Sequence, residues 1–315
     1  MNKLTGKCTY NIVSSSENKI IVNFTNNFAI MDINKKNTFD FVYPQLKNCN
    51  KLIRSNDNSK TIVLDTRGQG YLFDEIEQVV ICKISFGEDF ISQFFTAHKN
   101  GWYFINNENE IEWYDYVKNT IIQTDICGKY IAIFDDKDKD KAFFISIDDY
   151  GVEDNGFGKL LPIGYSLSVK CFSKKLEKFE DWNFSLPKGS LKNFRYVANH
   201  QYFVVMEEEK KTERDCIHTR VYLLDLENKT LNFLFNINDL NDWNNDGYFV
   251  NLEIEPECKK AYVLYSKKLI VIDLKTNKII STVPINFASD LKIISNYVVI
   301  ATWTGVFTIP LSELD

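Results

Sequence analysis

A repeated pattern of short apolar strands constrains this chain more than any other feature. Its clearest copy spans residues 260–285, KAYVLYSKKLIVIDLKTNKIISTVPI, where three runs of β-branched and aliphatic residues are separated by short polar turns. Runs of this length between turns predict an antiparallel meander. Three strands alone cannot bury both faces of a sheet, so this meander needs neighbours of its own kind.

Copies of the meander recur along most of the chain, and each follows a further short apolar strand. The first three copies start 41 residues apart. The copies begin at Lys19, Lys60, Gly101, Lys141, Tyr202, Lys260 and Tyr297. A period near 40 residues built from four strands is typical of a β-propeller blade. We therefore predict an all-β, seven-bladed β-propeller of four-stranded antiparallel blades. A propeller of six or eight blades would mean that one copy has been misjudged.

One position recurs in five copies, where the third strand ends in an apolar residue followed by aspartate. These aspartates are Asp32, Asp74, Asp115, Asp225 and Asp273. The position resembles the Trp-Asp site of the WD40 repeat, and LIVIDLKTNKII is similar to repeats of YVTN- and quinoprotein-type propellers. The resemblance spans nearly the whole chain and implies the propeller superfamily, without a particular activity. Since aspartate at a strand end accepts backbone N–H bonds from the next turn, we expect these residues to shape turns.

The composition predicts a single domain. Proline is scarce, with 6 residues, and no Pro/Gly/Ser-rich linker interrupts the pattern, so residues 1–315 are expected to form one propeller domain. The last copy stops at Asp315 before a fourth strand. We expect residues 1–7 to supply that strand.

The regular spacing fails in the middle of the chain, where extra residues lie at 148–158, 173–189, 207–218 and 236–247. In propellers, the turns between second and third strands and the links to the next blade leave on one rim, here called the top face. Our strand order places all four insertions on the top face over blades 4 to 6, and insertions gathered on one face of a repeat protein often mark its binding face. Residues 173–184 alternatively fit a short helix capped by Ser173.

Acidic and aromatic residues gather in these insertions, whereas the opposite rim is richer in lysine. The predicted partner-binding residues are Asp149, Tyr150, Trp182, Glu207, Glu208, Glu209, Asp242, Trp243 and Asp246. Such a surface would steer a basic protein partner and hold it through buried aromatic rings. The alternative is a solvated rim whose tryptophans cover blade edges.

No pattern predicts catalysis, a cofactor or a metal. Residues 136–140 alternate carboxylates like a calcium loop, but Lys141 and Ile147 stand where glycine and glutamate are needed. The histidines lack metal-binding spacing. They are His98, His200 and His218. The net charge of −6 and the absence of a basic run argue against direct nucleic-acid binding.

No stretch has the length and apolarity of a signal peptide or membrane span, so we expect a cytoplasmic protein that does not contact a membrane. Seven cysteines without a CxxC pair fit free thiols, most simply as small buried residues. The prediction is a non-catalytic protein-binding scaffold, such as an inhibitor or immunity protein neutralising a basic toxin or nuclease. The alternative is a propeller enzyme of hydrolase or lyase type, or a carbohydrate-binding protein, with its site at the central channel.

Overall fold

The described part of the chain is all-β. The computed structural model describes residues 1–315 except 17, 25–27, 38, 44–48, 66–68, 87–94, 137–139, 155–159, 188, 198–200, 208–218, 238–246, 256, 258 and 315. Within the strands, it describes only the backbone of residues 14–16, 40–43, 49–51, 149–154, 160–165 and 182. No helix in these residues is long and apolar enough to cross a membrane.

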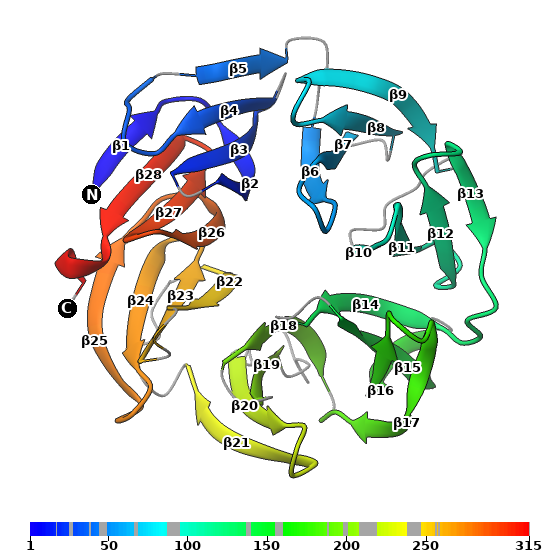
Figure 1. The fold of residues 1–315 in the computed structure, drawn as a ribbon. Helices are drawn as coiled ribbons and strands as arrows, with labels where there is room; N and C mark the ends of the chain where they lie inside the picture. The colour runs from blue at the N-terminus through cyan, green and yellow to red at the C-terminus, as the bar shows by residue number, and fades with distance from the viewer. Residues whose placement is uncertain are drawn as a thin grey trace. The chain divides into compact units, whose positions relative to one another are not determined.

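Seven four-stranded antiparallel sheets form the blades of a β-propeller in the described chain (Figure 1). The predicted fold and blade count are therefore confirmed. The blades group into two compact units, of which unit 1 comprises Met1–Arg54, Asn58–Ser85 and Asn238–Asp315. Unit 2 comprises Ser55–Asp57 and Phe86–Ile237. The expectation of a single domain stays a prediction.

Unit 1 carries blades 1, 2, 6 and 7. The strands of blades 1 and 2 are β2 (Thr9–Ser16), β3 (Lys19–Phe24), β4 (Phe28–Asp32), β5 (Phe39–Tyr43), β6 (Cys49–Arg54), β7 (Lys60–Asp65), β8 (Gln69–Asp74) and β9 (Val79–Ser85). Those of blades 6 and 7 are β22 (Phe249–Ile254), β23 (Lys260–Tyr265), β24 (Lys268–Asp273), β25 (Lys278–Pro284), β26 (Ala288–Ile294), β27 (Tyr297–Thr302), β28 (Gly305–Pro310) and β1 (Asn2–Thr5).

Unit 2 carries blades 3, 4 and 5. Their strands are β10 (Phe95–His98), β11 (Gly101–Ile105), β12 (Ile111–Asp115), β13 (Thr120–Gln123), β14 (Tyr130–Asp135), β15 (Lys141–Asp154), β16 (Leu160–Ser173), β17 (Lys178–Ser185), β18 (Ser190–Tyr196), β19 (Gln201–Glu207), β20 (Thr219–Asp225) and β21 (Thr230–Asn236).

Burial along the strands explains the sequence pattern. In blade 6, β23 and β24 are buried on both faces and read as continuous apolar runs, whereas the outer strand β25 alternates exposed and half-buried residues. The hydrophobic clusters lie between successive blades within each unit, for example Phe143 of blade 4 with Phe194 and Tyr202 of blade 5. Each sheet therefore buries its faces against its neighbours, as the meander requires.

The recurrent aspartates shape the turns between third and fourth strands. Asp74 Oδ1 accepts the backbone N–H groups of Ile76 and Glu77 at 2.9 Å, and Asp32, Asp115, Asp225 and Asp273 make equivalent bonds. The backbone N–H of Asn228 holds the pKa of Asp225 at about 2. The expected turn role of these residues is confirmed.

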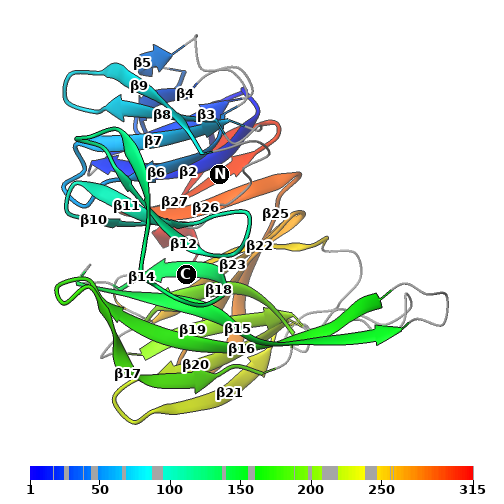
Figure 2. The same ribbon diagram turned by 90° about the vertical axis from the view of Figure 1, so that its right-hand side faces the viewer.

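Blade 4 departs from this rule and corrects one prediction. Its third strand ends at Ser173, whose Oγ accepts the Leu176 N–H at 3.4 Å in place of a carboxylate. Residues 174–177 are the turn into β17, so 173–189 holds a turn and a fourth strand and is neither a top-face insertion nor a helix. The added length of blade 4 lies in β15 and β16, which extend as one long hairpin (Figure 2).

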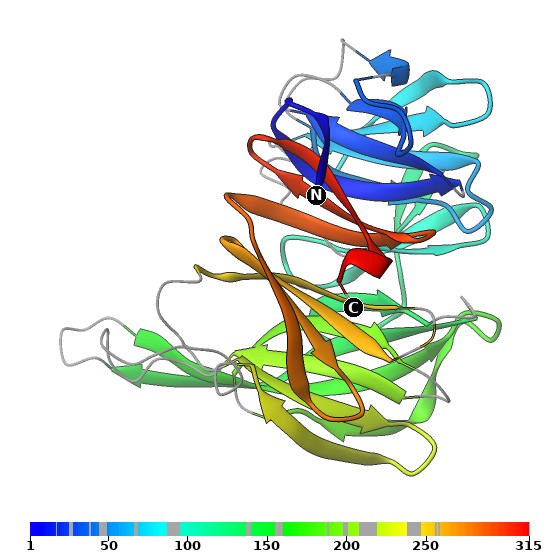
Figure 3. The same cartoon turned by 90° about the vertical axis from the view of Figure 1, so that its left-hand side faces the viewer.

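The N-terminal strand completes blade 7, as expected. β1 pairs antiparallel with β28, with Lys3 opposite Phe307, and the chain ends after the short 3-10 helix η2 (Leu311–Glu313) (Figure 3). Leu4 is buried in the cluster that blade 7 forms with blade 1, and its carbonyl accepts the Asn37 N–H at 2.8 Å.

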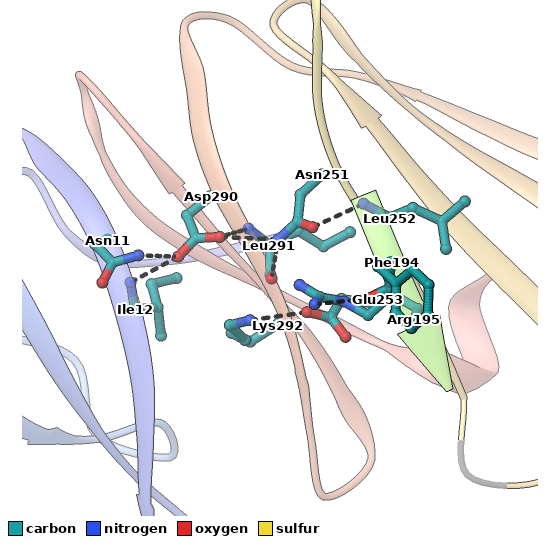
Figure 4. Close-up of polar contacts among 10 residues, drawn as sticks. All are labelled: Asn11, Ile12, Phe194, Arg195, Asn251, Leu252, Glu253, Asp290, Leu291 and Lys292. Atoms are coloured by element: carbon teal, nitrogen blue, oxygen red, sulfur yellow. Dashed lines mark hydrogen bonds and ion pairs between the residues drawn. The ribbon is translucent and has the colours of Figure 1, made fainter. Parts of the chain in front are cut away.

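A buried carboxylate joins three inner strands of unit 1 (Figure 4). Asp290 Oδ2 accepts Asn11 Nδ2 at 2.8 Å and the Ile12 N–H at 2.9 Å, while its Oδ1 accepts Asn251 Nδ2 at 3.0 Å. A β-bulge immediately precedes Asp290, Asn11 and Asn251 in their strands. Because a bulge re-aims the next side chain, the same irregularity in blades 1, 6 and 7 turns these polar groups toward one another.

Candidate docking surfaces

The extended hairpin of blade 4 forms an arm that no other described strand accompanies (Figure 2). β14 pairs with β15 only as far as Ser146, and β17 pairs with β16 only as far as Ser168. Beyond these, residues 149–154 pair with residues 160–166 and with no other described strand. Seven residues of strand reach roughly 20 Å. Both edges of this arm therefore present backbone N–H and C=O groups that can pair with another chain.

The base of the arm is fixed by buried hydroxyl groups. Ser146 and Ser168 lie opposite each other, with their Oγ atoms 2.7 Å apart. Both donate to Asp148 Oδ1, at 3.0 Å and 2.8 Å. The carboxylate thus anchors the first exposed residue of the arm to the body of the blade.

The predicted partner-binding residues have different outcomes. Asp149 and Tyr150 lie in the arm, and Glu207 ends β19 beside Lys192, with Oε2 to Nζ at 2.8 Å. Trp182 lies within the outer strand β17, so its assignment to a top-face insertion was wrong. Outside the described residues are Glu208, Glu209, Asp242, Trp243 and Asp246.

A groove of 710 Å³ lies between blades 3 and 4 of unit 2. Aromatic rings line part of it, including Tyr103 and Trp113, whose centroids are 4.7 Å apart. At one end, Glu177 Oε1 is 3.3 Å from His98 Nε2 and also accepts a bond from Lys99. His98 ends β10 and Lys99 follows it, whereas Glu177 lies in the turn before β17, and no local spacing signals that Glu177 meets the other two.

The buried imidazole of this groove predicts a pH dependence of stability. Burial lowers the pKa of His98 below its ordinary 6.5, and this outweighs the opposing bond from Glu177. The imidazole of His98 therefore binds a proton more tightly in the unfolded chain than in the folded chain. As a result, the free energy of unfolding decreases as the pH falls below about 6.5. We expect the thermal midpoint of the protein to fall between pH 7.5 and 5.5, and to fall less in His98→Gln. Parallel pH profiles of the two proteins would contradict this.

The polar residues considered as catalytic or metal sites are dispersed or otherwise engaged. The described residues contain no group of three or more His, Cys, Asp or Glu side chains placed to hold a metal ion. Asp136 accepts a hydrogen bond from the Tyr202 hydroxyl, whereas residues 137–139, His200 and His218 lie outside the described chain. Of the described cysteines, Cys171 is buried, and burial raises its pKa to about 12. Cys127 is exposed, contrary to the expectation of buried thiols.

Four aromatic residues of unit 1 are exposed to solvent. Tyr10, Tyr248, Phe287 and Trp303 are all exposed and lie at the ends of strands or in turns on the top face of that unit. Trp303 was recognisable from sequence as a turn tryptophan. Tyr10, Tyr248 and Phe287 lie at or just before the first strand of a blade, where apolar residues are usual. No neighbouring residue in the sequence distinguishes them from residues that become buried.

Comparisons with known proteins support the fold alone. No protein-family model matches the chain, and no curated protein matches it in sequence. Its structure is similar to hydrazine synthase of Kuenenia stuttgartiensis, with a TM-score of 0.72 and 13% identity over 100% of this chain and 97% of that one. It is also similar to the Cps50 (Swd1) β-propeller domain of Myceliophteria thermophila, with a TM-score of 0.71 and 8% identity over 98% of this chain and 99% of that one.

These neighbours confirm the likeness to WD40-like propellers at the level of the fold. One belongs to an enzyme and the other is a WD40 propeller domain, and 1320 solved chains match in all. A fold shared so widely does not select an activity, so function must be argued from the surfaces of this chain.

Proposed function

We propose that this chain is a non-catalytic protein-binding scaffold and that the β15–β16 arm docks a basic protein partner. The observation that supports the proposal most directly is the arm itself, a two-stranded ribbon paired with no other described strand. An isolated two-stranded hairpin is at best marginally stable in water, so a partner that adds a strand or covers a face would stabilise it.

The charge of the arm favours a basic partner. Residues 148–154 carry four carboxylates, Asp148, Asp149, Glu153 and Asp154, and the only basic residue in the sequence from 148 to 166 is Lys159. A concentration of one sign on a projecting element attracts the opposite charge over about a Debye length, which is about 8 Å at physiological salt. Complementary charge would then determine which partner binds, more than how tightly that partner binds.

The apolar residues of the arm would supply the contact area. Its sequence includes Tyr150, Val152, Leu161, Ile163 and Tyr165. Aromatic and aliphatic side chains are the residue types that contribute most of the contact energy in protein interfaces. A cytoplasmic inhibitor or immunity protein that neutralises a basic toxin or nuclease would use a surface of this kind, and we include that class in the proposal.

Two variants test the arm by recovery of partners from native lysate. In one, Asp149, Glu153 and Asp154 are changed to lysine. In the other, residues 150–165 are replaced by Asn-Gly, which leaves Asp149 opposite Ser166 across a two-residue turn. We expect both to lose the partners recovered by the wild type by at least about tenfold, or about 1.4 kcal/mol, as measured by quantitative mass spectrometry.

A matched variant controls for net charge. Glu77, Asp181 and Glu227 are exposed and lie away from the arm in sequence, and their change to lysine alters the total charge equally. This variant should keep its partners. If the arm variants recover the same basic proteins as the wild type, the proposed docking role is wrong.

A further inference from the structure

The two edges of the β15–β16 arm present different backbone groups. Successive residues of a strand turn their N–H and C=O groups to opposite edges. At the base of the arm, the Ile147 N–H donates to the Lys129 carbonyl at 2.9 Å, and the Leu167 carbonyl accepts the Leu186 N–H at 2.8 Å. Ile147 and Leu167 lie opposite each other in the hairpin, so this pair turns its backbone groups outward on both strands.

The register of the hairpin carries this alternation along the arm. At each of two β-bulges, two residues of one strand oppose one residue of the other, and the alternation of the ladder continues beyond them. Pairs that bond across the hairpin therefore alternate with pairs whose N–H and C=O groups point outward. The outward-facing pairs are Tyr150 with Tyr165, Val152 with Pro162, and Asp154 with Leu160.

The outer edge of β16 is interrupted at its middle position. Pro162 has no N–H group, so this edge lacks a donor there. The next residue, Ile163, has no opposite partner, because the register passes from Gly164 to Pro162 across the bulge. Prolines and bulges are the means by which natural proteins keep edge strands from pairing with other chains. The edge of β16 is therefore protected.

The outer edge of β15 is complete. Tyr150, Val152 and Asp154 each turn an N–H and a C=O group outward, at intervals of two residues or about 6.6 Å. Residues 149–154, DYGVED, include no proline, lysine or arginine, and each of them has an opposite partner in β16. This edge has none of the features that protect β16, so it can accept a further strand.

The acidic residues of the arm belong to the strand with the complete edge. All four carboxylates of residues 148–154 are in β15, whereas residues 160–166 of β16, LLPIGYS, carry no charge. The only basic residue from 148 to 166 is Lys159, which lies between the two strands. Opposite charges on neighbouring strands favour pairing and like charges oppose it. The charge of β15 therefore selects a basic segment.

We propose that the edge of β15 at residues 149–154, called the β15 edge, binds an extended basic segment of a protein partner by strand addition. The proposal rests on the docking role of the arm proposed above, and it adds which edge binds and in which conformation the partner binds. The backbone of the segment pairs with Tyr150, Val152 and Asp154, and its lysine or arginine residues meet the carboxylates of β15. The added strand converts the two-stranded ribbon into a three-stranded sheet.

Three fluorescein-labelled peptides test the conformation and charge of the bound segment by fluorescence anisotropy. The probe is RVKVTVKR. RVKPPVKR keeps every charge but lacks two adjacent N–H groups, one on each edge of the peptide, and DVEVTVED reverses the charge. The wild type should bind the probe and show at least about tenfold weaker affinity for the other two peptides. Equal binding of RVKPPVKR would overturn strand addition, as would no binding of the probe at millimolar concentration.

Moving one proline between opposed residues tests which edge binds. Val152→Pro removes an outward N–H from β15 without removing a bond of the hairpin. Val152→Pro/Pro162→Val keeps the composition and charge of the wild type and moves the missing donor from β16 to β15. Both variants should bind the probe at least about tenfold more weakly than the wild type, whereas Pro162→Val alone should change the affinity less than about twofold. Unchanged binding by Val152→Pro would refute the β15 edge.

Amide hydrogen exchange, followed by NMR, tests the edge without a substitution. In the free protein, the N–H groups of Tyr150 and Val152 should exchange at least about tenfold faster than those of Gly151 and Glu153, which bond across the hairpin. Saturation with RVKVTVKR should slow exchange at Tyr150 and Val152 at least about tenfold. Protection that appears at Tyr165 on the β16 edge instead would contradict the proposal.

Recovery of partners from native lysate separates this proposal from the docking role of the arm. We expect Val152→Pro to lose the partners that the variant lacking residues 150–165 loses. If the deletion variant loses its partners and Val152→Pro keeps them, the arm docks a protein, but strand addition at the β15 edge is wrong. If the deletion variant keeps them, the docking role and the β15 edge are both wrong.

Discussion

Replacement of Asp290 by alanine is expected to lower the free energy of unfolding by about 4 kcal/mol. The carboxylate is buried and accepts bonds from Asn11, Ile12 and Asn251 on the inner strands of two other blades (Figure 4). Alanine takes this acceptor away from the Asn11 amide and the Ile12 N–H, while Asn251 Nδ2 keeps its bond to the Leu291 carbonyl at 3.1 Å. Each buried donor that loses its acceptor costs about 1–3 kcal/mol. Urea unfolding followed by fluorescence or circular dichroism measures the loss.

Two variants calibrate this result. Asp290→Asn keeps the shape but replaces one acceptor oxygen with a donor, so it should lose about half as much stability. Asp181→Ala removes an exposed carboxylate from an outer strand and should change stability by less than about 0.5 kcal/mol. A loss below about 1 kcal/mol in Asp290→Ala would mean that the three inner strands are held together by packing alone.

Removal of residues 1–7 is expected to destabilise the protein by a similar amount, about 4 kcal/mol or more. The deletion takes away β1 and with it Leu4, which is buried at 3% exposure between blades 7 and 1. Loss of a buried leucine typically costs about 2–5 kcal/mol, and β28 would additionally become an unpaired edge. The same urea experiment on the truncated chain measures the effect.

The matching Leu4→Ala variant separates packing from pairing. It should account for about 2–3 kcal/mol, and the remainder belongs to the ladder between β1 and β28. A synthetic peptide of residues 1–7 added to the truncated chain should restore part of the lost stability. A truncated chain with the wild-type unfolding midpoint would show that β1 does not support blade 7.

The blades were predictable because each one repeats the same local chemistry. Apolar runs mark the second and third strands, and an aspartate such as Asp273 marks the turn after them. Blade 4 replaces this aspartate with Ser173, and its second and third strands are 14 residues each. Because blade 4 lacks both the short apolar run and the aspartate, the sequence pattern did not reveal its third strand. The turn after that strand was therefore interpreted as part of an insertion at residues 173–189.

The candidate docking surfaces were harder to predict because their properties arise only on folding. The sequence indicated an acidic region at 148–158, but not that it continues the ladder of blade 4 outward. Tyr248 and Phe287 carry no local signal of exposure. Their display depends on Ser266, which comes from a turn between them in sequence and bonds to both segments.

The way in which the arm is built determines how its length can change. Because β15 and β16 lengthen together, each added pair of opposed residues moves the tip outward by about 3.3 Å. Such changes need no rearrangement of the buried residues between blades 3, 4 and 5. Paired insertions or deletions in the hairpin can therefore change the reach of the arm, while the folding free energy of the rest of the blade changes little.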